Sequence, residues 1–135
     1  MNPNGDCYEG RFVYDARHGH GTYTWKNGNV YQGDFYEDKR QGKGTFNFAN
    51  GNVYEGDFVN GVFEGNGRYN FEGGFYEGKW KSGRYHGEGF LLFADGTRYK
   101  GQFLDGVAHG KGEETGADGT IRQGFWENGR QRASR

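Results

Sequence analysis

Cysteine and proline are almost missing from this sequence, which holds one of each in 135 residues. The single Cys7 excludes an internal disulfide and is typical of a protein in a reducing compartment. No apolar run approaches the ~20 residues that a membrane-spanning helix needs, and no segment resembles the apolar core of a secretory signal. We therefore expect a cytoplasmic protein.

Apolar residues are also scarce, at 32%, and the formal net charge is only -1. A charge this close to zero gives no general attraction to nucleic acid, so we expect no nucleic-acid partner. Glycine, in contrast, supplies 28 residues, and aromatic residues make up 19% of the chain. So much glycine with so little apolar content would normally suggest disorder. Both residue types recur at regular intervals, however, which indicates an ordered backbone shape that repeats.

The repeated unit is clearest in residues 76–89, which read YEGKWKSGRYHGEG. This unit and its variants open at residues 8, 31, 54, 76 and 99, and a degenerate copy opens at Arg122. A step of 22 or 23 residues predicts a repeat architecture. We assign repeats 1 to 5 to residues 8–30, 31–53, 54–75, 76–98 and 99–121, residues 1–7 to the tail end of a preceding repeat, and residues 122–135 to a partial terminal repeat with a basic tail.

Each repeat has the pattern of a β-hairpin. We count positions within a repeat from its opening residue, position 0; positions 0, 2 and 4 are an aromatic residue, glycine and an aromatic residue, as in Tyr54, Gly56 and Phe58. Spacing by two places these residues on one face of a strand. A Gly-x-Gly at position 11 is expected to open the second strand, whose positions 15 and 17 are aromatic or leucine in repeats 1 to 4. The intervening positions are largely polar, so one face is aromatic and the other wet.

Glycine has two expected roles in these hairpins. Tight two-residue turns with positive φ at both residues are predicted between successive repeats, at Asn27-Gly28, Asn50-Gly51, Asp95-Gly96 and Asp118-Gly119. Repeat 3 has Phe71-Glu72-Gly73-Gly74 there, and its missing residue is absorbed in the turn. Because glycine weakens a strand, the strand glycines are expected to leave room for a neighbouring aromatic ring to lie across the backbone. A single sheet could then acquire a core without a second layer.

The template, together with YQGDF, YEGDF and YKGQF in other copies, resembles the MORN repeat (membrane occupation and recognition nexus). The resemblance covers nearly the whole chain and departs from about Glu113 onward, where Glu114 and Gly116 replace hydrophobic residues. It implies an all-β fold: an elongated single antiparallel sheet of tandem β-hairpins, forming a solenoid-like rod with an aromatic groove. About twelve strands would make a sheet roughly 55 Å long.

The start of the sequence lies within a repeat. Residues 4–7 align with residues 27–30, so the chain begins in the turn after an earlier repeat, and no polar cap precedes it. We therefore expect a fragment of a longer array.

No pattern of catalytic residues stands out. Adjacent acidic residues such as Glu37 and Asp38 would point to opposite faces of a strand, and the Gly-x-Gly motifs lack the helix of a phosphate-binding fingerprint. We expect no catalysis and no cofactor.

The histidines give little reason to expect a metal ion. His18, His86 and His109 share position 10, but equivalent positions in successive hairpins are about 9–10 Å apart. That is too far to share a zinc ion held at ~2.0–2.1 Å, so we interpret them as turn histidines. A zinc site that joins Cys7 to a histidine across a dimer interface stays the alternative.

The first predicted function is a protein-interaction scaffold, and the resemblance implies cytoskeletal or membrane-associated partners. The predicted interaction groove comprises positions 0 and 4, namely Tyr8, Phe12, Tyr31, Phe35, Tyr54, Phe58, Tyr76, Trp80, Tyr99 and Phe103. An unpaired terminal edge is expected to bind a second copy and form a homodimer, through Arg122, Phe125, Trp126 and Arg130.

The second predicted function is binding of anionic phospholipid. Its clustered cations would be the basic tail and Lys79, Lys81, Arg84, Arg98 and Lys100. Residues 31–72 hold four Lys/Arg against seven Asp/Glu. This acidic segment would repel an anionic bilayer, which weighs against lipid binding. A third possibility is that the chain is the accessory region of an enzyme lying outside it.

Overall fold

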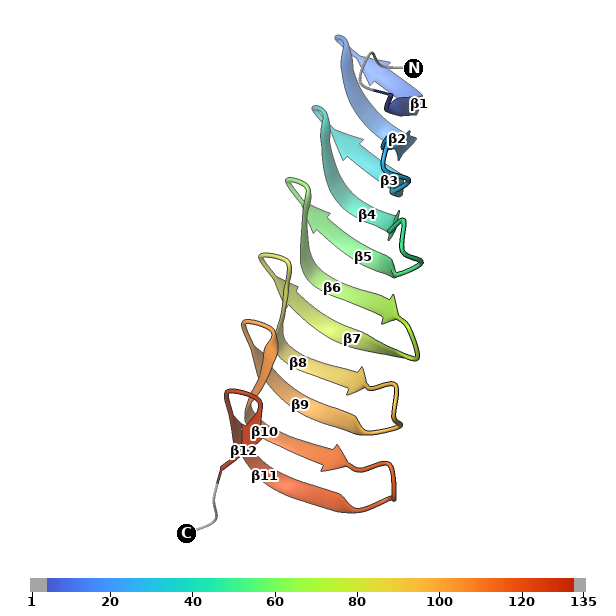
Figure 1. Cartoon of the computed structure of the whole chain (residues 1–135). Coiled ribbons are helices and arrows are strands. Elements are labelled where there is room, and N and C mark those ends of the chain that lie inside the picture. Colours follow the sequence, from blue (N-terminus) through green and yellow to red (C-terminus); the bar gives the residue numbers. More distant parts are fainter. Residues whose placement is uncertain (1–4, 133–135) are drawn as a thin grey trace.

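The computed structural model of the chain describes residues 5–132, which form twelve β-strands and no helix. Each strand pairs with the next, so the strands follow in sequence order in one antiparallel sheet (Figure 1). The strands are β1 Cys7–Val13, β2 Ala16–Thr24, β3 Val30–Tyr36, β4 Lys39–Asn47, β5 Val53–Val59, β6 Val62–Phe71, β7 Gly74–Lys81, β8 Arg84–Leu92, β9 Arg98–Leu104, β10 Val107–Thr115, β11 Ile121–Glu127 and β12 Arg130–Gln131.

This architecture confirms the predicted all-β, elongated single sheet of tandem hairpins. The first strand, β1, and the last, β12, lie toward opposite ends of the sheet (Figure 1). Residues 1–4, in the predicted preceding turn, and 133–135, in the basic tail, lie outside the described residues. Between residues 5 and 132 there is no helix with the length and hydropathy to cross a membrane.

Two-residue turns join the two strands within each repeat; between repeats, where they were predicted, only Glu72-Gly73 among the described connections joins its strands with two residues. Glu37 and Asp38 join β3 to β4 with φ values of 46° and 71°, the left-handed region for both residues. The Asn-Gly dipeptides of that prediction instead lie in longer connections such as residues 25–29. There Gly28 has a φ of 98°, while the Asn27 side chain accepts a hydrogen bond from the Asn29 amide at 3.0 Å. The predicted φ pattern was therefore wrong for Asn27, but the shortened turn after repeat 3 is confirmed.

The second strand of each hairpin begins earlier than predicted, at position 8, so His18, His86 and His109 lie in strands rather than turns. The Gly-x-Gly motif marks an irregularity in that strand. In repeat 2, Gly33 pairs with Gly44 and the next pair is Phe35 with Arg40, which leaves extra residues in β4.

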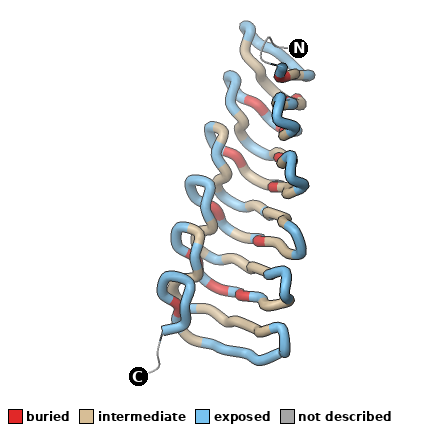
Figure 2. The backbone as a smooth tube through the Cα atoms, viewed as in Figure 1, coloured by how far each residue is buried: buried red, intermediate tan, exposed pale blue. Residues whose placement is uncertain are grey.

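The core lies on one face of this single sheet, as predicted. Buried segments recur from repeat to repeat along the strands (Figure 2). An added Cβ at Gly67 would lie 2.5 Å from Cε1 of Tyr54, so the tyrosine ring occupies the space that any other residue would fill. The expected role of the strand glycines is therefore confirmed. The buried hydrophobic residues are Tyr23, Tyr31, Phe35, Phe46, Tyr54, Phe58, Tyr76, Trp80, Tyr99, Phe103 and Trp126.

Candidate protein-interaction groove

A ladder of aromatic rings runs along the core face, which we call the groove face. The ring of Phe58, at position 4 of repeat 3, lies 5.2 Å from Tyr54 of its own repeat and 5.0 Å from Tyr31 of the preceding one. Both contacts are nearly perpendicular, at 85° and 83°, which is the favourable edge-to-face geometry. Trp80 contacts Tyr76 and Tyr54 in the same way. Position 4 therefore ties each repeat to its predecessor.

The hydroxyl groups of the buried position-0 tyrosines are hydrogen-bonded within their own strands. Tyr31, Tyr54 and Tyr76 each donate a hydrogen bond of 2.7 Å to the backbone carbonyl three residues later. Burial raises the pKa of all three hydroxyls above the ordinary value. These tyrosines have exposures of 0% and thus form the floor of the groove.

The ten residues predicted for the groove share one face, but eight of them are buried. Only Tyr8 and Phe12, in the first repeat, are more open. The rings that line the surface above this floor come from other positions and include Trp25, Phe48 and Tyr69. The binding role of the predicted set stays a prediction, and a ligand would meet these upper rings first.

Position 9 supplies groove residues that the sequence interpretation missed. Phe63 stacks flat on Tyr54 at 3.8 Å and 8°, and Tyr85 stacks on Tyr76 at 3.9 Å and 8°. Burial raises the pKa of Tyr85 to about 12. Position 9 is arginine in repeats 1 and 2 and a different residue in each of repeats 3 to 5, so it carries no signal common to all repeats. Position 9 pairs with position 4 across the hairpin, as Tyr85 does with Trp80, but the second strand was predicted to begin only at position 11.

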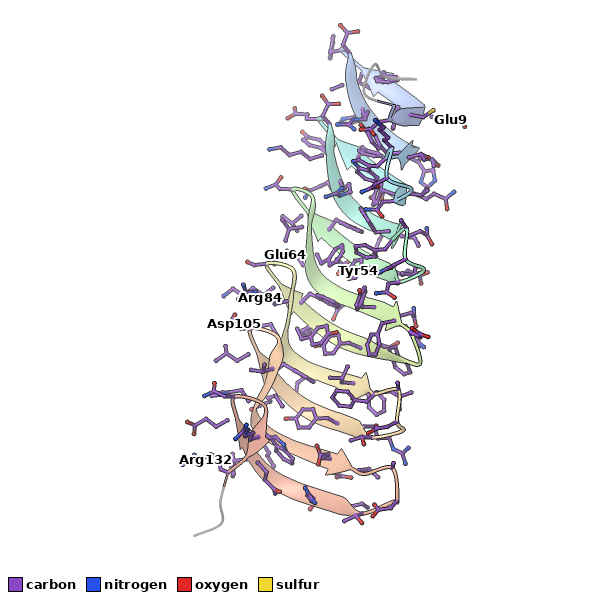
Figure 3. All side chains as sticks on the ribbon, viewed as in Figure 1. Glu9, Tyr54, Glu64, Arg84, Asp105 and Arg132 are labelled. Atoms are coloured by element: carbon purple, nitrogen blue, oxygen red, sulfur yellow. The ribbon has the colours of Figure 1, made fainter. Side chains whose placement is uncertain are left out.

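Some of these rings surround a depression in the middle of the groove face, with a volume of about 380 Å³. Its lining residues are Phe48, Phe63, Tyr69, Trp80, Gly83, Arg84, Tyr85 and Gly106. The Trp80 indole donates to the Gly67 carbonyl at 3.0 Å, so its polar group is already satisfied. Arg84 is the charged residue of this lining and lies beside the tight turns (Figure 3). The depression therefore suits apolar groups with a negative charge nearby.

Two arginines fill position 9 in the first repeats. The guanidinium of Arg40 lies over the rings of Trp25 and Phe46, at 5.4 and 5.3 Å, and donates to the Gly61 carbonyl at 2.7 Å. Burial lowers its pKa from the ordinary value, although an arginine stays protonated in the physiological range.

Arg17 in repeat 1 is held in place by Asp38. Its backbone amide donates to the Asp38 carboxylate at 2.8 Å and its Nε at 3.0 Å, and these bonds hold the pKa of Asp38 below its usual value. The first two repeats thus fill this part of the groove with their own cations.

The terminal edge differs from its prediction. Trp126 is 3% exposed and its ring lies 5.1 Å from Tyr99, so it belongs to the aromatic ladder and not to an open edge. Phe125, in contrast, is 58% exposed. Arg130 lies in β12, which pairs with Trp126 and Glu127. The Arg132 amide and the Gln131 side chain also donate to the carbonyls of Phe125 and Gln123, at 2.7 and 3.1 Å, so among the described residues the open edge of β11 is its beginning. Arg122, on that open part, approaches Glu114 at 3.8 Å.

Position 10 forms a contact between successive repeats. Gln41 accepts a hydrogen bond from the Asn60 amide at 2.8 Å, in the tight turn of the next repeat. The Nδ1 atom of His18 accepts the equivalent bond at 3.4 Å, whereas Nδ1 of His86 and of His109 is buried without a partner in the described part. No three metal-ligating side chains gather within residues 5–132. The zinc site across a dimer interface stays a prediction.

An open sheet of similar hairpins, with its core on one face, defines a single-layer repeat protein. A family model for the MORN repeat matches residues 8–30, 31–53, 54–74, 76–98 and 99–121. The chain therefore belongs to the MORN repeat family. MORN repeats are non-catalytic modules that generally mediate protein or membrane interactions. A search among curated proteins found no significant match to the chain.

Proposed function

We propose that the chain is a non-enzymatic scaffold module that binds a segment of a partner protein in the depression of its groove face. The observation that carries this proposal is the aromatic lining of that depression, with Phe48, Tyr69 and Tyr85 above a satisfied floor. Tyrosine, tryptophan and arginine are the residue types that dominate binding hot spots. Rings held by stacking lose little conformational freedom when a ligand covers them.

The chemistry of the depression narrows the kind of segment that fits. Its apolar walls call for a hydrophobic side chain, and Arg84 calls for an acidic residue near it. Polar groups of the floor such as the Trp80 indole and the Tyr76 hydroxyl are already bonded within the chain, so little affinity would come from hydrogen bonds to them. A cytoskeletal or membrane-associated protein is the proposed source of this segment.

A matched pair of variants tests the proposal. Phe48→Ser removes a ring that lines the depression, whereas Phe90→Ser removes a ring that packs on Phe75 and is absent from that lining. Both variants and the wild type would capture proteins from the source cells, with quantitative mass spectrometry and thermal unfolding as the control for folding. We expect proteins that the wild type and Phe90→Ser retain and that Phe48→Ser loses. An unchanged set with Phe48→Ser would contradict the proposal.

Self-association through the C-terminal repeats is proposed as the basis of assembly. It is supported by the exposure of Ile121 and Phe125, 59% and 58%, on the partly open strand β11. Sedimentation at several concentrations should show a dimer that Phe125→Ser weakens. A strictly monomeric wild type at high concentration would end this part of the proposal.

Membrane binding is the second candidate. Lys81 and Arg84 are register partners at the tip of β7–β8. Exposed apolar pairs, Val59 with Val62 and Leu104 with Val107, occupy the equivalent sites in the two neighbouring repeats. Such a row of cations between apolar groups suits an anionic bilayer. Flotation with vesicles that contain phosphatidylserine decides between the candidates, because strong, salt-sensitive recruitment would favour the membrane.

A further inference from the structure

Repeat 5 lacks the large side chain that occupies position 9 in the other repeats. Arg40 fills this place in repeat 2 with its guanidinium, and Phe63 and Tyr85 fill it with rings in repeats 3 and 4. The equivalent residue of repeat 5 is Ala108, whose side chain is a single methyl group. A cavity of about 240 Å³ lies there, which we call the Ala108 socket.

The walls of the Ala108 socket match the surroundings of Arg40 position by position. In repeat 2 the guanidinium of Arg40 lies within 6.0 Å of four ring centroids, Trp25, Tyr31, Phe46 and Phe58, and bonds to the carbonyl of Gly61. The equivalent residues of repeat 5 all line the socket, and they are Phe93, Tyr99, Glu114, Trp126 and Gly129.

One of these replacements changes the charge of the site. Glu114 stands where repeat 2 has Phe46, so a carboxylate takes the place of a ring. Tyr99 and Trp126 are each 3% exposed, so the floor of the socket is packed much like the floor under Arg40, where Tyr31 and Phe58 are 0% and 1% exposed. The socket is therefore a position-9 site whose own side chain is missing. Its wall carries the negative charge of Glu114, which favours a cation such as the guanidinium of Arg40 over the rings of Phe63 and Tyr85.

We propose that the Ala108 socket binds the side chain of an arginine from an extended segment of a partner protein. This inference rests on the proposed function, namely that the groove face binds protein. Aromatic faces attract a cation, and Glu114 adds a direct charge interaction. Arginine fits better than lysine because its planar group stacks on rings and reaches a carbonyl at the same time, as Arg40 does.

Arg122 is the charged neighbour that would compete with a partner arginine for the carboxylate of Glu114. Its Nη1 lies 3.8 Å from Oε1 of Glu114, and its side chain is 64% exposed. An exposed pair at this distance contributes little, and Arg122 is not among the residues that line the socket. Removing Arg122 should therefore strengthen binding of a foreign guanidinium.

The test uses blocked pentapeptides of glycine with a central arginine, lysine or citrulline, where citrulline is the neutral isostere of arginine. Nuclear magnetic resonance would follow the indole N–H of Trp126 in the whole chain at low salt. We expect saturable shifts with the arginine peptide and roughly tenfold weaker binding of the citrulline peptide. Glu114→Gln should weaken the arginine peptide by roughly fivefold, and Arg122→Ala should strengthen it.

Ala108→Arg supplies the missing side chain from within the chain and should abolish these shifts. Equal affinity for the arginine and citrulline peptides, tighter binding of the lysine peptide, or no shift with the arginine peptide would each overturn the proposal. Unchanged binding in both Ala108→Arg and Glu114→Gln would do the same. Phe48→Ser separates this result from the proposed function, because it alters the central depression and leaves the residues of the socket in place.

Discussion

Gly67→Ala should destabilise the sheet through a single contact, which makes it a direct test of the ring-over-glycine packing. The added Cβ would lie 2.5 Å from Cε1 and 2.6 Å from Cζ of Tyr54, whereas ordinary contacts begin at 3.4 Å. The ring must therefore retreat by about 1 Å. Phe63 stacks on it at 3.8 Å, and Phe58 and Trp80 meet it edge-on, so it has no empty space to enter.

The magnitude follows from what the displaced ring loses. Overpacking of a buried site costs about 1–3 kcal/mol, and loss of the hydrogen bond from Tyr54 to the Asp57 carbonyl adds about 1 kcal/mol. We expect a decrease of roughly 2–4 kcal/mol in the free energy of unfolding, measured by urea denaturation with circular dichroism.

A double-mutant cycle isolates the contact. Tyr54→Ala alone should cost about 3–5 kcal/mol, because it removes a fully buried ring. In that background Gly67→Ala should cost nothing and could even add about 0.5 kcal/mol, since alanine restricts the unfolded chain more than glycine does. Equal costs of Gly67→Ala in the two backgrounds would refute the reasoning.

Three further predictions concern the aromatic ladder and the contacts between repeats. Burial raises the folded-state pKa values of Tyr31, Tyr54 and Tyr76 above 10. The free energy of unfolding is therefore complete below pH 10 and falls above it, by about 1.4 kcal/mol per pH unit for each tyrosine. Alkaline titration, followed by tyrosinate absorbance and circular dichroism, should show that these tyrosines ionise only when the protein unfolds. His86→Gln should raise the free energy of unfolding by about 1 kcal/mol, because Gln41 makes the turn hydrogen bond that Nδ1 of His86 lacks, and no gain in urea denaturation would contradict this. Trp126→Ala should cost about 3–5 kcal/mol and Phe125→Ala less than about 0.5 kcal/mol, and equal thermal shifts of the two variants would argue against the burial of Trp126.

The strand glycines show how far periodicity alone can reach. Gly67 and its equivalents recur at a constant distance from a tyrosine, and glycine in a strand needs a reason, so a ring across the backbone could be predicted without coordinates. The number of strands and their order follow from the same repeat, because consecutive hairpins with short connections pair in sequence order.

The turns were harder to predict because the same kind of dipeptide occurs both within the repeats and between them. Asn27-Gly28 has the composition of a two-residue turn, but it lies in a longer connection, where a side-chain hydrogen bond from the Asn29 amide holds Asn27. The tight turns inside the repeats include Asn60-Gly61, Ser82-Gly83, Asp105-Gly106 and Asn128-Gly129, all with positive φ at both residues. Composition therefore marks both kinds of connection alike, and only the pairing of the strands tells them apart.

The candidate site was least predictable where the repeats differ. Position 9 holds Arg40, Phe63, Tyr85 and Ala108 in successive repeats, so a search for shared residues passes over it. The tyrosines that recur in repeats 1 to 5 form the floor of the groove. Position 9, which differs between repeats, shapes the surface above that floor. In this fold a departure from the repeat pattern is thus the better indication of a binding residue.

The sharing of each position-4 ring between two repeats gives the array a natural unit of length. Phe58 and Trp80 make the same pair of edge-on contacts, each to its own tyrosine and to the tyrosine before it. Removal of residues 54–75 would place Trp80 against Tyr31, in the geometry that Phe58 now has. Gain or loss of one such unit therefore changes the length of the groove by one hairpin, or about 10 Å. The position-4 ring at the new junction still makes the same two kinds of edge-on contact.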